Sequence, residues 1–185
     1  MLDLTARSLP ELFAGFVQTC DATEMGRIQD SIGQAVARLD AITVEAKHER
    51  SLLAAELDPG PLLRTLLRLR HDIVMIGRAA AAPLPASFQQ RLGPLLTRVS
   101  ETAADYLRRS GQALAAQDAP PSLGQAEAAL DSCADAFARI RNEGLTRGLP
   151  GDTVERIFAL GFALEQFRHN FRDLRRCVEE ASGRA

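Results

Sequence analysis

The feature that most constrains the fold of this chain is a series of long amphipathic segments separated by proline and glycine. The clearest segment runs from about residue 23 to residue 57, and its apolar residues recur at alternating spacings of three and four: Met25, Ile28, Ile32, Ala35, Leu39, Ile42, Ala46 and Leu53. This heptad spacing predicts one long helix packed nearly antiparallel against a partner. The helix should end at Asp58-Pro59-Gly60-Pro61, because proline lacks the amide hydrogen that a helix interior requires.

Similar apolar stripes predict a short helix from about residue 8 to 20 and longer ones over residues 62–81, 87–116 and 153–181, with another after the linker Ala119-Pro120-Pro121-Ser122. Ser8 and Asp152 are the expected N-caps. No run of β-branched residues alternates with polar ones, so we expect no strands. The predicted fold is an all-α bundle of about five to six mostly antiparallel helices, forming a single domain over residues 1–185.

Composition excludes several classes of function. A net charge of −2 offers no concentrated positive surface for DNA or RNA. Cys20, Cys133 and Cys177 lie far apart and predict neither a disulfide framework nor a zinc site. No apolar stretch approaches the roughly 18 to 20 residues of a membrane span, and the N-terminus does not resemble a signal peptide. We also find no phosphate-binding loop and no catalytic constellation, and we expect no cofactor.

One metal motif requires comment. Glu45 and His48 have the spacing at which helical bundles hold di-iron centres, but a working site needs a second such pair. The nearest match, Glu165 with His169, is one residue too long. A metal-dependent bundle enzyme therefore remains only a third hypothesis.

The segment 62–81 carries a basic ridge, which we define as Arg64, Arg68, His71 and Arg78 on one helix face. The ridge is either a solvated face paired with acidic neighbours or a surface that binds an anion or a partner.

Arg70 is predicted to point toward the apolar side of the same helix. A buried guanidinium needs a carboxylate, for which Glu49, Glu165 and Asp173 are candidates. Glu49 interrupts the heptad seam and is the preferred partner. The expected role of the pair is to fix helix register.

In the last helix, Phe158 and Phe162 lie opposite the main apolar stripe. We expect this helix to be central, with neighbours on both sides. The alternative is that the second face contacts another chain or domain. A short echo between Leu69-Arg70-His71-Asp72-Ile73 and Phe167-Arg168-His169-Asn170-Phe171 is too short to establish a repeat, and we treat it as coincidental.

Three stretches carry a family resemblance: EAKHER at residues 45–50, LLRLRHDIVMIGR at 66–78 followed by PLP at 83–85, and IFALGFALEQFR at 157–168. Together they resemble the soluble region of the fusaric acid resistance family of bacterial inner-membrane proteins, which export aromatic acids. The resemblance implies a domain excised from a larger membrane protein, located at the cytoplasmic face of the inner membrane. Arg70, Asp72 and Arg78 match its most distinctive motif.

The resulting expectation is a non-enzymatic domain of an efflux transporter that acts in assembly, oligomerisation or gating. Its partners would be the transmembrane regions of the same polypeptide, with a homo-oligomer as a further option. The alternative is a free-standing cytosolic regulator, similar in outline to phosphate-uptake regulators, that binds a protein through the basic ridge or the two phenylalanines.

Overall fold

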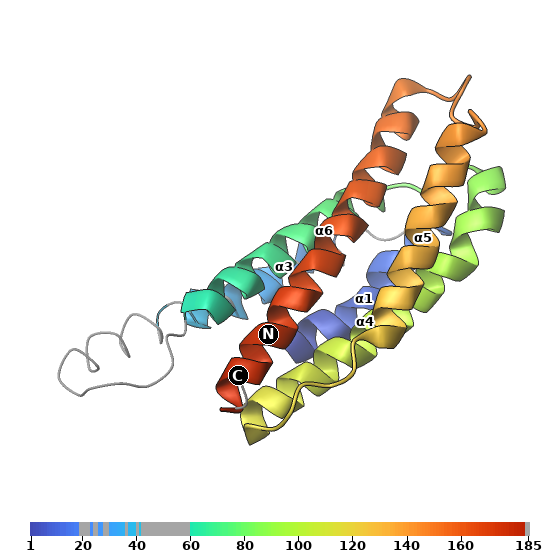
Figure 1. Cartoon of the computed structure of the whole chain (residues 1–185). Helices are drawn as coiled ribbons and strands as arrows, with labels where there is room; N and C mark the ends of the chain where they lie inside the picture. The colour runs from blue at the N-terminus through green and yellow to red at the C-terminus, as the bar shows by residue number, and fades with distance from the viewer. Residues whose placement is uncertain are drawn as a thin grey trace.

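The chain folds as an all-α bundle, as predicted (Figure 1). The computed structural model describes residues 1–18, 23, 26–27, 30–35, 37–39, 41 and 60–183. The helices are α1 (Leu2–Ala14), α3 (Gly60–Ala79), α4 (Ala86–Ala116), α5 (Gly124–Asn142) and α6 (Gly151–Ala181). Helical residues also occur among those described between positions 23 and 41, which we call the 23–41 segment. No described helix is both long enough and apolar enough to cross a membrane.

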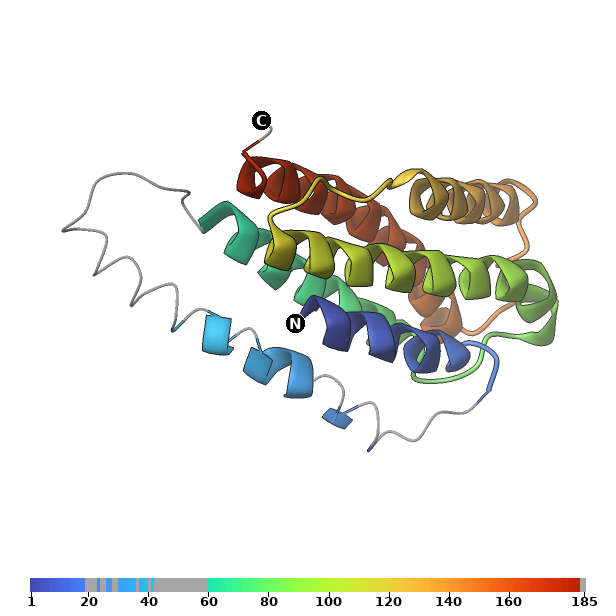
Figure 2. The same cartoon turned by 90° about the horizontal axis from the view of Figure 1, so that it is seen from below.

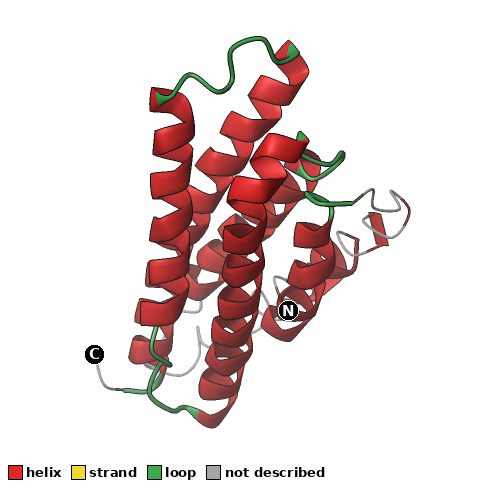
Figure 3. Ribbon diagram, turned by 90° about the vertical axis from the view of Figure 1, so that its right-hand side faces the viewer, coloured by secondary structure: helices red, strands yellow, loops and turns green. Residues whose placement is uncertain are grey.

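Short loops connect the helices from α3 onward (Figure 3). The predicted linker at residues 119–122 lies between α4 and α5, as expected. The helix before it ends at Ala116, and the C-cap residue Gln117 has a left-handed φ of 53° that stops the helix.

Two antiparallel helix pairs form the centre of the bundle. In the α3–α6 pair, Thr65 near the start of α3 lies 3.9 Å from Cys177 near the end of α6, measured from Oγ1 to Sγ. In the α1–α4 pair, Leu2 packs beside Gly111, late in α4. The carbonyl of Phe16, beyond α1, accepts a 2.9 Å hydrogen bond from the amide of Leu84, just before α4. One continuous hydrophobic core joins both pairs.

The start of α1 differs from the sequence-based prediction. Ser8 does not cap the helix but lies inside it, where its hydroxyl donates to the carbonyls of Leu4 and Thr5. The helix begins at Leu2 because Leu2 and Ala6 are buried against the core, which favours helix upstream of the predicted cap. Pro10 is therefore inside the helix.

The predicted cap of α6 also differs. Pro150 occupies the N-cap position and no side chain caps the helix. Asp152 lies in the first turn instead. There its carboxylate still interacts favourably with the positive end of the helix dipole.

The two halves of the chain repeat one another at an offset of 98 residues, the separation of Asp72 and Asn170. In the first helix pair, buried positions of α1 recur in α4: Leu2, Thr5, Ala6, Ser8, Leu9 and Leu12 against Ser100, Ala103, Ala104, Tyr106, Leu107 and Ser110. In the second pair, those of α3 recur in α6: Thr65, Leu66, Leu69, Asp72, Ile73, Ile76 and Ala79 against Ala163, Leu164, Phe167, Asn170, Phe171, Leu174 and Cys177.

The same offset relates the 23–41 segment to α5. Ile32 is buried like Leu130 in α5. Figure 2 shows the 23–41 segment and α5 at opposite corners of the bundle, each beside its own half. The bundle therefore has an approximate twofold axis, which relates α1 to α4 and α3 to α6. The short echo in the sequence is therefore part of a repeat, and treating it as coincidental was wrong.

Candidate functional site

The structure separates the residues that the sequence nominated. Arg70, Asp72 and Arg78 lie on α3, and Phe158 and Phe162 lie near the start of α6. Glu49 lies outside the described residues, together with Glu45 and His48 of the possible metal motif. No single cavity collects the nominated set within the described part of the chain.

Asp72 is the centre of the α3–α6 contact. Its side chain is 3% exposed, and the Nδ2 atom of Asn170 donates a 2.6 Å hydrogen bond to its Oδ2. Because Asp72 and Asn170 are equivalent positions of the two halves, this bond lies at the approximate twofold axis. A hydrogen bond at such a point sets the register of the two helices.

The environment of Asp72 disfavours its charged form. Burial raises the pKa of Asp72 from 3.8 to about 7, because the carboxylate loses its hydration. The hydrogen bond from Asn170 and the charge of Arg68 lower the pKa, but by less than burial raises it. Near neutral pH the group therefore exists as a mixture of carboxyl and carboxylate.

Arg70 does not form the buried ion pair that the sequence predicted. Arg70 is exposed, and the buried stripe of α3 includes Asp72 in its place. A side-chain carbon added to Gly33 would lie 3.3 Å from a guanidinium nitrogen of Arg70, so this side chain lies beside Gly33 in the 23–41 segment. The other proposed partners are engaged elsewhere: Glu165 pairs with Arg168, and Asp173 with Arg68 and Arg176.

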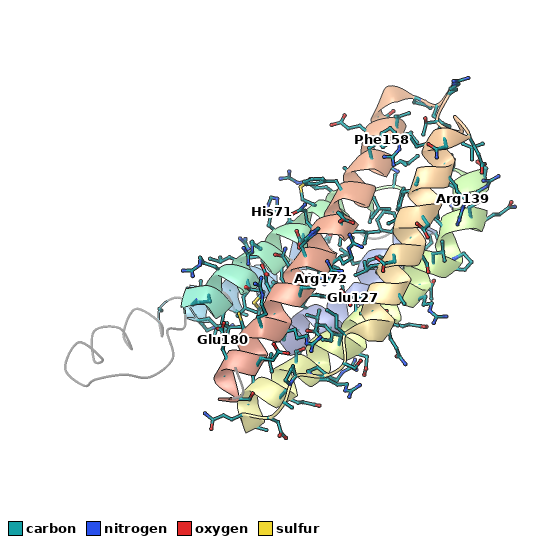
Figure 4. All side chains as sticks on the ribbon, viewed as in Figure 1. His71, Glu127, Arg139, Phe158, Arg172 and Glu180 are labelled. Atoms are coloured by element: carbon teal, nitrogen blue, oxygen red, sulfur yellow. The ribbon has the colours of Figure 1, made fainter. Side chains whose placement is uncertain are left out.

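The arginine equivalent to Arg70 in the second half is Arg168, and it is paired. Its guanidinium donates to Asp131 of α5 and to Glu165 of its own helix, and both acids raise its pKa. Asp131 is the counterpart of Gly33, so both arginines extend toward the same place in their halves. A second bond between α5 and α6 joins Arg172 Nε to Glu127 at 2.6 Å, with both residues labelled in Figure 4.

The basic ridge is exposed along α3, as the spacing predicts, and Figure 4 places His71 on the outer side of the helix. Arg68 donates a 2.6 Å hydrogen bond to Asp173 of α6. Among the described carboxylates, none pairs with Arg64 or Arg78. The ridge thus combines a structural ion pair with two cations that have no carboxylate partner among the described residues.

Phe158 and Phe162 are exposed by 44% and 62%. The expectation that neighbouring helices cover both faces of α6 is therefore wrong at this end. Phe137 of α5 packs over Gly161 on an adjoining side, within 3.6 Å of where a Cβ would lie, and leaves the two rings outside the bundle. The alternative interpretation, a contact surface, fits this exposure.

The buried nucleophilic groups that the structure describes have a structural role. Burial raises the pKa of Cys133 to about 12 and also raises that of Cys177, so both thiols stay protonated and unreactive. Burial likewise raises the pKa of Tyr106 to about 12, and its hydroxyl donates to the Phe171 carbonyl at 3.1 Å. No group of three potential metal ligands occurs within the described ranges.

Comparison of the chain with protein-family models, with characterised proteins and with solved structures finds no match.

Sequence reasoning missed two residues that organise this region, Asn170 and Arg168. The signal that could have found them was the echo around Arg-His-Asp and Arg-His-Asn. Its two copies meet across the α3–α6 contact.

Proposed function

We propose that this chain is a non-enzymatic helical module that packs against another protein through Phe158 and Phe162. The observation that carries the proposal is the exposure of two large rings one helical turn apart, 44% and 62%. Isolated exposed apolar residues are common on proteins, whereas neighbouring ones mark contact sites. Fully burying an exposed phenylalanine contributes about 1.5–3 kcal/mol, so covering the exposed part of each ring would contribute a corresponding fraction of that free energy.

The surroundings of the two rings suit a protein contact. Exposed Glu155 and His169 and half-buried Glu165 lie on the same helix. An apolar centre with a polar border is the usual composition of such a surface.

The family resemblance supplies the finer part of the proposal. On that basis the module belongs to an efflux-type inner-membrane protein and lies at the cytoplasmic face. It acts there in assembly, oligomerisation or gating. The natural reading frame tests this part: encoded membrane helices beside this region agree with it, and start and stop codons at both ends of the region contradict it.

The second candidate is a free-standing regulator that binds an acidic protein segment. Arg64 and Arg78 favour it, since no described carboxylate compensates either charge. The double variant Arg64→Ser, Arg78→Ser would bind such a partner more weakly. Increasing salt would also lower the affinity, because salt screens exposed charges.

Self-association of the purified chain tests the contact surface directly. We expect a concentration-dependent dimer in sedimentation experiments, and its loss in the double variant Phe158→Ser, Phe162→Ser. Leu67→Ser is the matched control, because Leu67 is also 44% exposed but lies on α3. A wild-type chain that stays monomeric at high concentration, or a double variant that dimerises as well as wild type, contradicts oligomerisation through this face.

A further inference from the structure

An open, mostly apolar pocket of about 490 Å³ lies at one end of the bundle. It forms where the start of α1, the start of α3, the end of α4 and Leu39 of the 23–41 segment meet. Leu62, Leu66 and Leu114 form much of its wall, and Gly111 contributes no side chain to it. Its volume falls in the range of ordinary small-molecule sites, roughly 300–1,000 Å³.

The repeat explains why the space is present. At the offset of 98 residues, Leu114 corresponds to Phe16, Gly111 to Phe13 and Leu39 to Phe137. At each of these three positions the pocket has a leucine or no side chain, and the equivalent position has a phenyl ring. The pocket is therefore the counterpart of a place, related to it by the approximate twofold axis, at which three aromatic residues lie.

Burial at the two places agrees with this comparison. Phe16 and Leu160 are 1% and 0% exposed. Their counterparts at the pocket, Leu114 and Leu62, are only partly buried. The apolar surface at the pocket is thus left partly uncovered, whereas the surface at the equivalent place is covered.

The charges at the rim are already paired. Asp3 lies 2.8 Å from Arg7, and Arg108 lies 3.7 Å from Asp105. The charged side chains of the lining are Asp3 and Arg108, and both are already paired, so neither side chain is free to bind an ion. A charged ligand would lose its hydration without gaining a free side-chain partner.

We propose that this pocket binds a neutral aromatic molecule of one or two rings. The rings replace the phenyl groups that fill the equivalent place, and the paired rim charges select an uncharged molecule. An apolar cavity of about 150 Å³ is enough to hold benzene. The larger volume here accommodates a second ring.

Binding of 2-naphthol, followed by its own fluorescence, tests the proposal. The chain has no tryptophan and one tyrosine, so the protein contributes little background emission. We expect a saturable change with the wild-type chain and at least a tenfold loss of affinity in Leu114→Phe. That variant copies Phe16, the residue at the equivalent position, and should also raise the melting temperature. Leu145→Phe, on an exposed residue in the α5–α6 connection, is the matched control and should bind like wild type.

A second variant, Gly111→Ala, tests the pocket even if the Leu114→Phe protein does not fold. Gly111→Ala adds one methyl group at the pocket wall and should weaken binding measurably. 2-Naphthoate, the carboxylate of similar shape, should bind more weakly than 2-naphthol. Absence of saturable binding to the wild-type chain, unchanged affinity in both pocket variants, or tighter binding of the carboxylate would each overturn the proposal.

Discussion

Asp72 places a carboxyl group inside the α3–α6 contact, where its only described side-chain hydrogen-bond partner is the amide of Asn170. A raised pKa has a definite consequence for stability. The unfolded chain releases the Asp72 proton near pH 3.8, whereas the folded chain holds it until about pH 7. Between those values the folded state binds more protons, so its stability falls as pH rises.

Replacing Asp72 with asparagine should remove this loss, because the amide cannot ionise and matches Asn170 in shape. A carboxyl that titrates near 7 instead of 3.8 loses about 4 kcal/mol of folding free energy across that interval. We therefore expect Asp72→Asn to stabilise the protein at pH 8 by a few kcal/mol and to have little effect at pH 4. Denaturant titrations at both pH values measure the difference.

Asp105→Asn serves as the control, since the Asp105 side chain is 53% exposed. Its effect should be small and nearly the same at both pH values. If the effect of Asp72→Asn on stability is also the same at pH 4 and pH 8, the carboxyl of Asp72 is not held in its protonated form.

Arg70 and Arg168 allow a comparison of equivalent residues with different partners. Arg168→Ala should cost about 1 kcal/mol, because Asp131 and Glu165 lose the cation between them. Arg70→Ala should cost less than about 0.5 kcal/mol, since no described carboxylate pairs with it. Thermal unfolding of both variants tests the order. Equal losses would mean that Arg70 has a bound partner in solution.

Arg70 also shows where residue-level inference from sequence reaches its limit. A helical wheel located the apolar side of α3 correctly but not its edges. Which residue at an edge is buried depends on the neighbours, and here α6 covers Asp72 while Arg70 remains exposed. The motif around both residues was visible in the sequence, but the bond from Asp72 to Asn170 required the three-dimensional pairing.

At the scale of single elements, α4 offers a direct test of its contact with α1. Glycine inside a helix is less favourable than alanine by about 0.5–1 kcal/mol. A Cβ at Gly111 would lie 3.5 Å from the Cβ of Leu2, an ordinary contact distance. We expect Gly111→Ala to raise stability by about that amount in chemical denaturation.

Gly144 provides the opposite case in the same experiment. Its φ of 66° is left-handed, and a Cβ there would lie 3.1 Å from Nε of Arg147. Gly144→Ala should therefore destabilise by about 1 kcal/mol. A loss of stability in Gly111→Ala would show that Leu2 cannot move to accept the methyl group.

Most elements could be predicted from periodicity and from prolines, since α3, α4 and α6 lie within a few residues of their expected ranges. The caps could not. Ser8 and Asp152 have the right chemistry for N-caps, but burial of Leu2 and the position of Pro150 start the helices earlier. Capping preferences are worth about 1 kcal/mol, and packing of a buried leucine can exceed them.

At the scale of the whole molecule, the main apolar contacts join the two halves: α1 packs on α4, and α3 packs on α6. A fragment that ends in the α3–α4 connection should therefore lack a complete core. We expect the fragments 1–82 and 83–185 to show little cooperative unfolding when expressed separately. Expressed together, they should associate and recover helical content. Circular dichroism of each fragment and of the mixture measures this, and a cooperative transition in either fragment alone would contradict it.

The repeat was hard to recognise in the sequence because the halves share burial and geometry more than residue identity. Buried alanine and leucine positions correspond at the fixed offset, but the less buried positions between them have diverged, as in Gly33 against Asp131. Only the Arg-His-Asp and Arg-His-Asn echo was close enough to notice. The structure reveals the repeat because equivalent positions are buried alike even where their amino acids differ.

The hydrogen bond between Asp72 and Asn170 bears on which amino-acid substitutions the two halves of the chain can carry. In a dimer of identical chains, a residue on the symmetry axis meets its own copy, so an aspartate would face an aspartate and an asparagine an asparagine. Two carboxyl groups at that distance cannot both ionise. A single chain that carries both halves escapes this restriction. It can place an acid opposite an amide, and each half can then carry substitutions that a symmetric dimer could not tolerate.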